Sequence, residues 1–161
     1  MHELSGYVVS PLREGHVALS RGSGTGLSPI LLVSAEKHSL GSVEQLEHEY
    51  ALKSELDAGW AARPISLTHH NDCMTLVLED PGGTPLDLLL GGPLEIPRFL
   101  GIAIALAGAL GHLHERGLIH KDIKPANISR YRRARQSLAL LQDSPSNIGS
   151  SRPDAGTKAA L

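Results

Sequence analysis

Short apolar runs separated by turn-forming residues fill the first half of the chain and predict a small antiparallel sheet. The expected strands are residues 7–9, 16–20, 30–33, 64–67 and 74–78. Gly, Ser, Asn and Asp cluster between these runs, and such residues favour hairpin turns. The glycine-rich segment 22–26 is therefore interpreted as a hairpin turn, although its spacing also resembles a phosphate-binding loop.

A helix is expected at residues 43–56, between the third and fourth strands. Val43, Leu46 and Tyr50 recur at helical spacing. Ser42 is the expected N-cap, and Gln45 lies three residues later, where a capping box places its second partner.

A second, longer helix is expected at residues 97–116, ended by Gly117. Charged residues occur only at its two ends, so it is apolar on every side, which is typical of a buried core helix. A short helix at 86–90 precedes it. The chain therefore predicts an α+β fold with a sheet region first and a helical region second.

Amino-acid composition excludes few classes of protein. The chain has 161 residues, a net charge of −2 and 3% aromatic residues, so its core must be built from Leu, Ala, Val and Ile. Cys73 is the single cysteine, which excludes an internal disulfide and fits a reducing compartment. We expect no signal peptide and no membrane segment, because no apolar run reaches the ~20 residues that a spanning helix needs. A cytoplasmic protein is expected.

The most specific motif is residues 118–128, Leu-Ile-His-Lys-Asp-Ile-Lys-Pro-Ala-Asn-Ile. It resembles the catalytic loop of protein kinases, and its Lys-Pro pair resembles the serine/threonine type. The resemblance implies that Asp122 is the catalytic base, that Lys124 stabilises charge on the transferred phosphoryl group and that Asn127 holds Mg²⁺. It also implies that His120 packs inside and holds the loop.

The resemblance extends over residues 4–128, which we interpret as a partial protein-kinase-like domain. The implied fold is α+β, with an antiparallel β small lobe containing one helix and an incomplete helical large lobe. Segments 46–52, 80–86 and 117–127 together resemble the N-terminal kinase-like domain of bacterial hybrid sensor histidine kinases.

The resemblance also implies a nucleotide site. Glu49 occupies the place of the helix glutamate that pairs with a strand lysine, although a solvated helix face is the alternative interpretation. Gly15 occupies the glycine-rich loop, and Glu79 and Asp80 occupy the hinge that contacts adenine through backbone groups.

Two parts of that site depart from the kinase pattern. The strand at residues 30–33 ends in Val33 followed by Ser34, and Lys37 lies three residues further on, where we expect a loop. In the segment around Gly15 the other glycines are missing, which places ATP affinity in doubt.

Residues 129–161 have a different character. They contain six Lys or Arg residues against two Asp residues, are rich in Ser, Pro, Gly and Ala, and include neither Asp-Phe-Gly nor Ala-Pro-Glu. We expect this tail to be disordered, and interpret the abrupt change as a shifted reading frame or a gene remnant. The tail lacks aromatic stacking residues other than Tyr131, and no nucleic-acid partner is expected.

The sequence therefore favours a serine/threonine kinase domain fragment that uses ATP and Mg²⁺ in bacterial signal transduction and is inactive as an isolated chain. The alternative is a non-catalytic, kinase-like interaction module. The protein substrate and the oligomeric state are not indicated. His69, His70 and Cys73 lack a fourth ligand at zinc-site spacing and are interpreted as hairpin residues.

Overall fold

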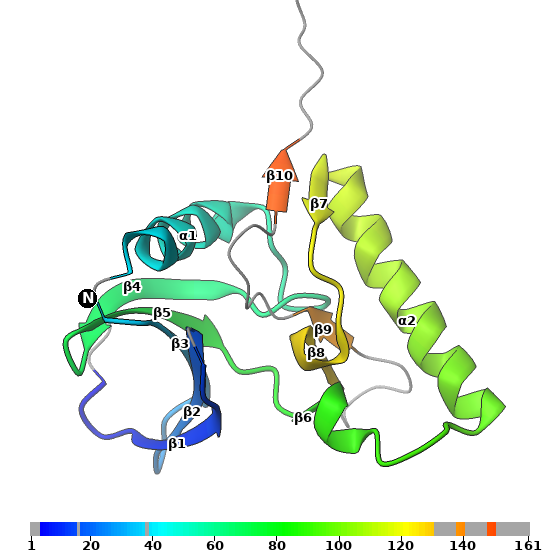
Figure 1. Cartoon of the computed structure of the whole chain (residues 1–161), viewed down its shortest axis with the longest axis horizontal. Coiled ribbons are helices and arrows are strands. Elements are labelled where there is room, and N and C mark those ends of the chain that lie inside the picture. The colour runs from blue at the N-terminus through cyan, green and yellow to red at the C-terminus, as the bar shows by residue number, and fades with distance from the viewer. Residues whose placement is uncertain (1–3, 16, 38, 131–137, 141–147, 151–161) are drawn as a thin grey trace, which may run out of the picture.

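A five-stranded antiparallel sheet forms the first half of the computed structural model, which describes residues 4–15, 17–37, 39–130, 138–140 and 148–150 (Figure 1). Its strand order is β1-β2-β3-β5-β4. The strands are β1 Val8–Arg13, β2 Val17–Ser23, β3 Ile30–Ala35, β4 Pro64–His70 and β5 Cys73–Glu79. All five expected strands are confirmed, and each extends beyond its predicted apolar run because ladder hydrogen bonds continue into polar residues.

Two hairpin connections join neighbouring strands as expected. The β2–β3 connection is residues 24–29 and contains Gly26 with a φ of 75°. The glycine-rich segment therefore belongs to a hairpin, with residues 22–23 at the end of β2 and the remainder in the connection. The β4–β5 connection places Asn71 and Asp72 at φ values of 51° and 62°. Asn and Asp tolerate this left-handed conformation better than most residues, and two such residues in succession form the turn that matches strand twist.

Helix α1, Leu40–Ala51, lies along one face of this sheet (Figure 1). Leu46 is fully buried and packs in one cluster with Leu31, Val33 and Leu76 of the sheet. The opposite sheet face carries a smaller cluster that includes Ile30 and other apolar side chains. The sheet with α1 is called the small lobe below.

The helix begins earlier than the sequence predicts, and the expected N-cap at Ser42 is wrong. Ser39 is the N-cap, and its hydroxyl accepts the backbone N–H of Ser42 at 3.4 Å. Ser42 itself is buried, and the Gln45 side chain donates to Glu49 instead of reaching back to a cap. A 3₁₀ turn, η1 Leu52–Ser54, ends the helical segment.

The second half of the described chain has one long helix and short strands. Its elements are β6 Thr84–Pro85, η2 Leu86–Leu89, α2 Ile96–Glu115, β7 Leu118–His120, η3 Pro125–Asn127, β8 Ile128–Arg130, β9 Leu138–Leu140 and β10 Ile148–Ser150. Strands β6, β8 and β9 form one small sheet, and β7 pairs with β10. This arrangement of a helix-covered antiparallel sheet and a helical remainder is the expected protein-kinase-like α+β fold.

The α1–β4 connection attaches the small lobe to α2. Leu56 and Trp60 of this connection are buried in one cluster with Ala109 and Leu113 of α2. The Trp60 ring stacks on the ring of His112 with 6.0 Å between centroids, so one aromatic residue joins segments that are far apart in the sequence.

Helix α2 is less buried than its composition predicts. Ala109 and Leu113 are its buried residues, whereas Ile96, Phe99 and Ile104 are 72%, 55% and 60% exposed. The expectation that α2 is buried on every side is therefore wrong for the described residues, because these residues cover only one stripe of the helix surface. By length and composition α2 is also apolar enough to cross a membrane, so the expected absence of a membrane segment stays a prediction.

The expected disordered tail falls mostly on residues 131–137, 141–147 and 151–161, which lie outside the described residues. Within the rest of that segment, β9 pairs with β8 and β10 pairs with β7, both antiparallel. The short strands β9 and β10 were not expected from the sequence, since their apolar runs are too brief to predict pairing without a known partner strand.

Candidate active site

The kinase-like motif forms a loop held between β7 and β8. His120, the last residue of β7, is 6% exposed, and its Nδ1 accepts the backbone N–H of Asp122 at 3.3 Å. The loop ends in η3, where the Asn127 N–H donates to the Lys124 carbonyl at 2.9 Å. Pro125 favours this turn because its ring fixes φ near the helical value.

Asn127 joins the two ends of the loop. Its Nδ2 donates to the backbone carbonyl and to Oδ2 of Asp122, both at 3.0 Å. The residue is fully buried, so these bonds form away from competing water. They hold the Asp122 carboxylate in one orientation relative to the loop backbone.

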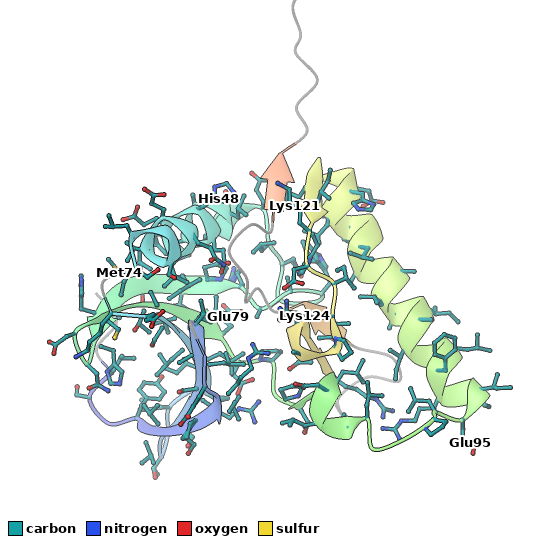
Figure 2. All side chains as sticks on the ribbon, in the orientation of Figure 1. His48, Met74, Glu79, Glu95, Lys121 and Lys124 are labelled. Carbon is teal, nitrogen blue, oxygen red and sulfur yellow. The ribbon has the colours of Figure 1, made fainter. Side chains whose placement is uncertain are left out.

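Lys124 completes the cluster. Its Nζ lies 2.5 Å from Asp122 Oδ2, and the two side chains are 40% and 27% exposed. Figure 2 shows Lys124 in the region between the small lobe and α2. A carboxylate and an ammonium group therefore face accessible space together, which suits a site that accepts a hydroxyl proton beside an anionic group.

The oxygen atoms of this cluster suit a hard cation. Asn127 Oδ1 is buried and has no hydrogen-bond partner among the described residues, although an amide oxygen is a good acceptor. Amide and carboxylate oxygens are the ligands that Mg²⁺ takes from proteins, usually with waters and phosphate oxygens completing the shell. Asn127 and Asp122 therefore fit the Mg²⁺ that the motif implies. The described residues contain no group of three His, Cys, Asp or Glu residues able to hold a metal.

Glu49 lies inside the small lobe, so the solvated-face interpretation is wrong. It is 4% exposed, and its Oε1 accepts from Gln45 Nε2 at 2.9 Å, whereas Oε2 has no hydrogen-bond partner among the described residues. Burial raises the pKa of Glu49 to about 7, against which the Gln45 hydrogen bond acts to lower it. The side chain therefore keeps a proton to a higher pH than an exposed glutamate does.

A strand lysine does not reach Glu49 among the described residues. Val33 is 1% exposed and belongs to the apolar cluster beneath α1. Ser34 faces the other way and shares a 2.8 Å hydrogen bond with Thr75. Lys37 lies in the loop after β3, as expected, and its Nζ is 3.4 Å from the carboxylate of Asp72 in the exposed β4–β5 turn.

Glu79 and Asp80, the two expected hinge residues, lie where the chain leaves β5. Their side chains are paired with arginines: Glu79 Oε1 with Arg63 at 2.5 Å and Asp80 Oδ2 with Arg21 at 2.5 Å. Their N–H groups donate within the protein, to the carbonyls of Arg63 and Pro29. Contacts from these two residues to an adenine would therefore come from carbonyl oxygens.

Gly15 lies in the exposed turn between β1 and β2. A Cβ built at this position meets its nearest atom, the Val17 carbonyl oxygen, only at 3.8 Å, so the surroundings leave room for a side chain. His16 beside it lies outside the described residues. The structure thus places Gly15 in the β1–β2 turn, where glycine is favoured by its φ of 156°, which residues with a side chain rarely adopt, and not by a close contact.

A small pocket opens between this turn and η2. Its volume is about 140 Å³, and it is lined by Leu12, Arg13, Leu19, Pro85, Asp87 and Leu88. Sequence reasoning did not single out Arg13 or Asp87. No sequence signal could have paired them, because Asp87 lies 74 positions and Ala126 lies 113 positions after Arg13 in the chain.

Comparison with known proteins supports the motif. The chain is 30% identical over 142 residues to the serine/threonine-protein kinase Pkn2 of Myxococcus xanthus, covering 84% of this chain. The chain contains part of a protein kinase domain. The kinase PknG of Mycolicibacterium smegmatis is 38% identical over 60 residues, or 37% of this chain. The peroxide stress-activated histidine kinase mak2 of Schizosaccharomyces pombe is 32% identical over 88 residues, or 50% of this chain.

This kinase-like chain spans only a small part of these relatives: 17% of Pkn2, 8% of PknG and 4% of mak2. No family model matches the chain. The activities, substrates and partners of these longer relatives are therefore only proposals for this kinase-like chain.

Proposed function

We propose that this chain supplies the small lobe and catalytic loop of a cytoplasmic serine/threonine kinase domain that transfers the γ-phosphate of Mg·ATP to a protein hydroxyl in bacterial signal transduction. The observation that supports this proposal is that the side chains of Lys124 and Asn127 are both in contact with the side chain of Asp122. The Asp122 carboxylate lies 3.0 Å from Asn127 Nδ2 and 2.5 Å from Lys124 Nζ.

Each side chain has a chemical role in this proposal. Asp122 accepts or orients the proton of the substrate hydroxyl, and Asn127 Nδ2 keeps its carboxylate in place. Lys124 offsets negative charge beside the transferred group. Asn127 Oδ1 and an Asp122 oxygen would hold Mg²⁺, and His120 positions the loop from inside. Mg·ATP, when bound, supplies the phosphoryl group and neutralises charge on its oxygens.

The second candidate is a non-catalytic, kinase-like module. The buried Glu49 without a strand lysine among the described residues favours it, and so does the absence of Asp-Phe-Gly from the sequence. For these reasons we expect the 161-residue chain alone to show no phosphotransfer, even where it binds nucleotide. An interaction role would then depend on the small-lobe surface.

Calorimetric titration of the purified chain with ATP, in Mg²⁺ and then in EDTA, tests the proposal. We expect ATP to bind in the micromolar to millimolar range and Mg²⁺ to tighten binding at least tenfold. Asp122→Asn should reduce that Mg²⁺ dependence, whereas Asp72→Asn, in the distant β4–β5 turn, should not. No binding of ATP by a folded chain, or binding indifferent to Mg²⁺, would favour the non-catalytic module.

A phosphotransfer assay with radiolabelled ATP and a generic protein substrate tests the expected inactivity. We expect no transfer above the Asp122→Asn background. Transfer that Asp122→Asn abolishes and Asp72→Asn preserves would show that the isolated chain is an active enzyme.

A further inference from the structure

The side chain of Arg13, the last residue of β1, reaches the catalytic loop. Pro11 and Arg13 pair with the consecutive residues Ser20 and Leu19, so Leu12 is an extra residue in the strand. Such a bulge turns the following side chain away from its regular direction. Arg13 Nη1 donates to the Ala126 carbonyl at 3.4 Å, and these residues are 113 positions apart in the sequence.

A small pocket and two carboxylates lie around this guanidinium. Burial lowers the pKa of Arg13, and the charges of Asp87 and Asp122 act in the opposite direction. The side chain lines the 140 Å³ pocket, whose other walls are mostly apolar. The pocket is smaller than the roughly 300–1,000 Å³ of typical ligand sites, and Asp87 adds a carboxylate to its wall, so it can hold only part of a ligand, with Arg13 as its cation.

Val33 ends the apolar strand run where the kinase pattern places a lysine, and Lys37 lies beside Asp72 in an exposed hairpin. Lys124 lies against Asp122 and, in the proposed function, beside the transferred phosphoryl group, so Arg13 is a second cation near the catalytic loop. Arg13 joins the pocket to the loop that carries Asp122. Its guanidinium has a fork of N–H donors that matches phosphate oxygens, which a single ammonium lacks.

We propose that Arg13 binds the phosphate groups of the nucleotide and takes the place of the missing strand lysine. The proposal rests on the proposed nucleotide-binding function. The contact with the Ala126 carbonyl, at 3.4 Å, is at the long limit for a hydrogen bond. The guanidinium also faces the carboxylates of Asp87 and Asp122, with which a bound phosphate would share its N–H donors.

The test compares ligands that differ only in their phosphates. Affinities for ATP, ADP and adenosine are measured by calorimetry for the wild-type chain, Arg13→Ala, Arg13→Lys and the control Arg98→Ala, whose side chain is on the exposed start of α2. We expect Arg13→Ala to weaken ATP and ADP at least tenfold and adenosine less than twofold. Arg13→Lys should fall between wild type and Arg13→Ala, because it keeps the charge and loses the fork.

Three results would overturn the proposal. Equal ATP affinity in wild type and Arg13→Ala would show that Arg13 does not bind phosphate, while the proposed function stands. Tighter binding of both adenosine and ATP by Arg13→Ala would show that Arg13 closes the pocket. Absence of binding of every ligand to the wild-type chain would reject the nucleotide-binding function together with this inference. Melting temperatures of the variants verify that each one is folded.

Discussion

At the scale of single residues, the buried carboxyl of Glu49 determines how the small lobe responds to pH. Its pKa is raised from 4.5 to about 7, so the folded state binds a proton more tightly than the unfolded chain does. The contribution of this group to the free energy of unfolding is therefore greatest below pH 4.5. It declines as pH rises to about 7, because ionisation then favours the unfolded state.

We predict that Glu49→Gln removes this decline. Relative to wild type, the variant should become more stable between pH 5 and pH 8 by roughly 3 kcal/mol, the value of a shift of this size. Urea denaturation at pH 5, 6, 7 and 8 measures the difference. The exposed neighbour Glu47→Gln serves as the control and should show the wild-type pH dependence. Parallel curves for wild type and Glu49→Gln would contradict the prediction.

Restoring a lysine at the end of β3 should couple to the same carboxyl. Val33 packs in the cluster that contains Leu46, and Glu49 lies one turn after Leu46 on the same helix face. We expect Val33→Lys to lower the free energy of unfolding both in the wild-type chain and in the Glu49→Gln variant. The loss should be smaller by at least about 1 kcal/mol in the wild-type chain, where Glu49 can pair with the new lysine. A double-mutant cycle by denaturation measures this coupling, and additive effects would show that the two side chains do not meet.

Much of the catalytic loop was predictable at this scale, because its residues are neighbours in the sequence. Asp122, Lys124 and Asn127 lie within six consecutive residues, and a local turn brings them together. The contact of Arg13 with Ala126 and its interaction with Asp87 were not predictable, since both residues lie far along the chain.

At the scale of elements, helix α2 combines an apolar composition with an exposed first half. Phe99 and Ile104 are more than half exposed, and an apolar patch of this kind favours association in water. We predict that Phe99→Ser combined with Ile104→Ser reduces self-association of the chain at high concentration, as measured by light scattering. The melting temperature should change little, because both side chains are outside the buried cluster around Leu113.

A matched pair of variants distinguishes this surface effect from unfolding. Leu113→Ser removes a side chain that is 1% exposed and should lower stability by several kcal/mol. If the double surface variant were destabilised as much as Leu113→Ser, the exposure of Phe99 and Ile104 would be contradicted.

The start of α1 offers a second prediction at the element scale. Ser39→Ala should cost about 1 kcal/mol of stability, because its hydroxyl caps the Ser42 N–H. Ser54→Ala, at an exposed position just past the helix, is the control. Equal stability of both variants in urea would show that Ser39 does not cap the helix.

At the scale of the whole molecule, stability is unevenly distributed. Strands β3 and β5 are central in the sheet and almost wholly buried, whereas the first half of α2 has little cover. We predict that amides of β3 and β5 exchange with deuterium most slowly and that those of residues 96–104 exchange among the fastest in regular structure. Uniform protection across both regions in mass-spectrometric exchange would contradict this and indicate a single cooperative unit.

The sequence by itself determined the five strands of the small-lobe sheet, the existence of the two helices and the catalytic-loop cluster. Strand alternation, helical spacing and turn residues are local properties, and the loop residues are close in the chain. Only the tertiary structure decided that Glu49 is buried without a strand lysine among the described residues, that Arg13 reaches the catalytic loop and that α2 is half exposed. These features depend on which segments, distant in the sequence, pack against each other in the fold. That packing decides which side chains are buried and which charges are paired, and residue type alone does not.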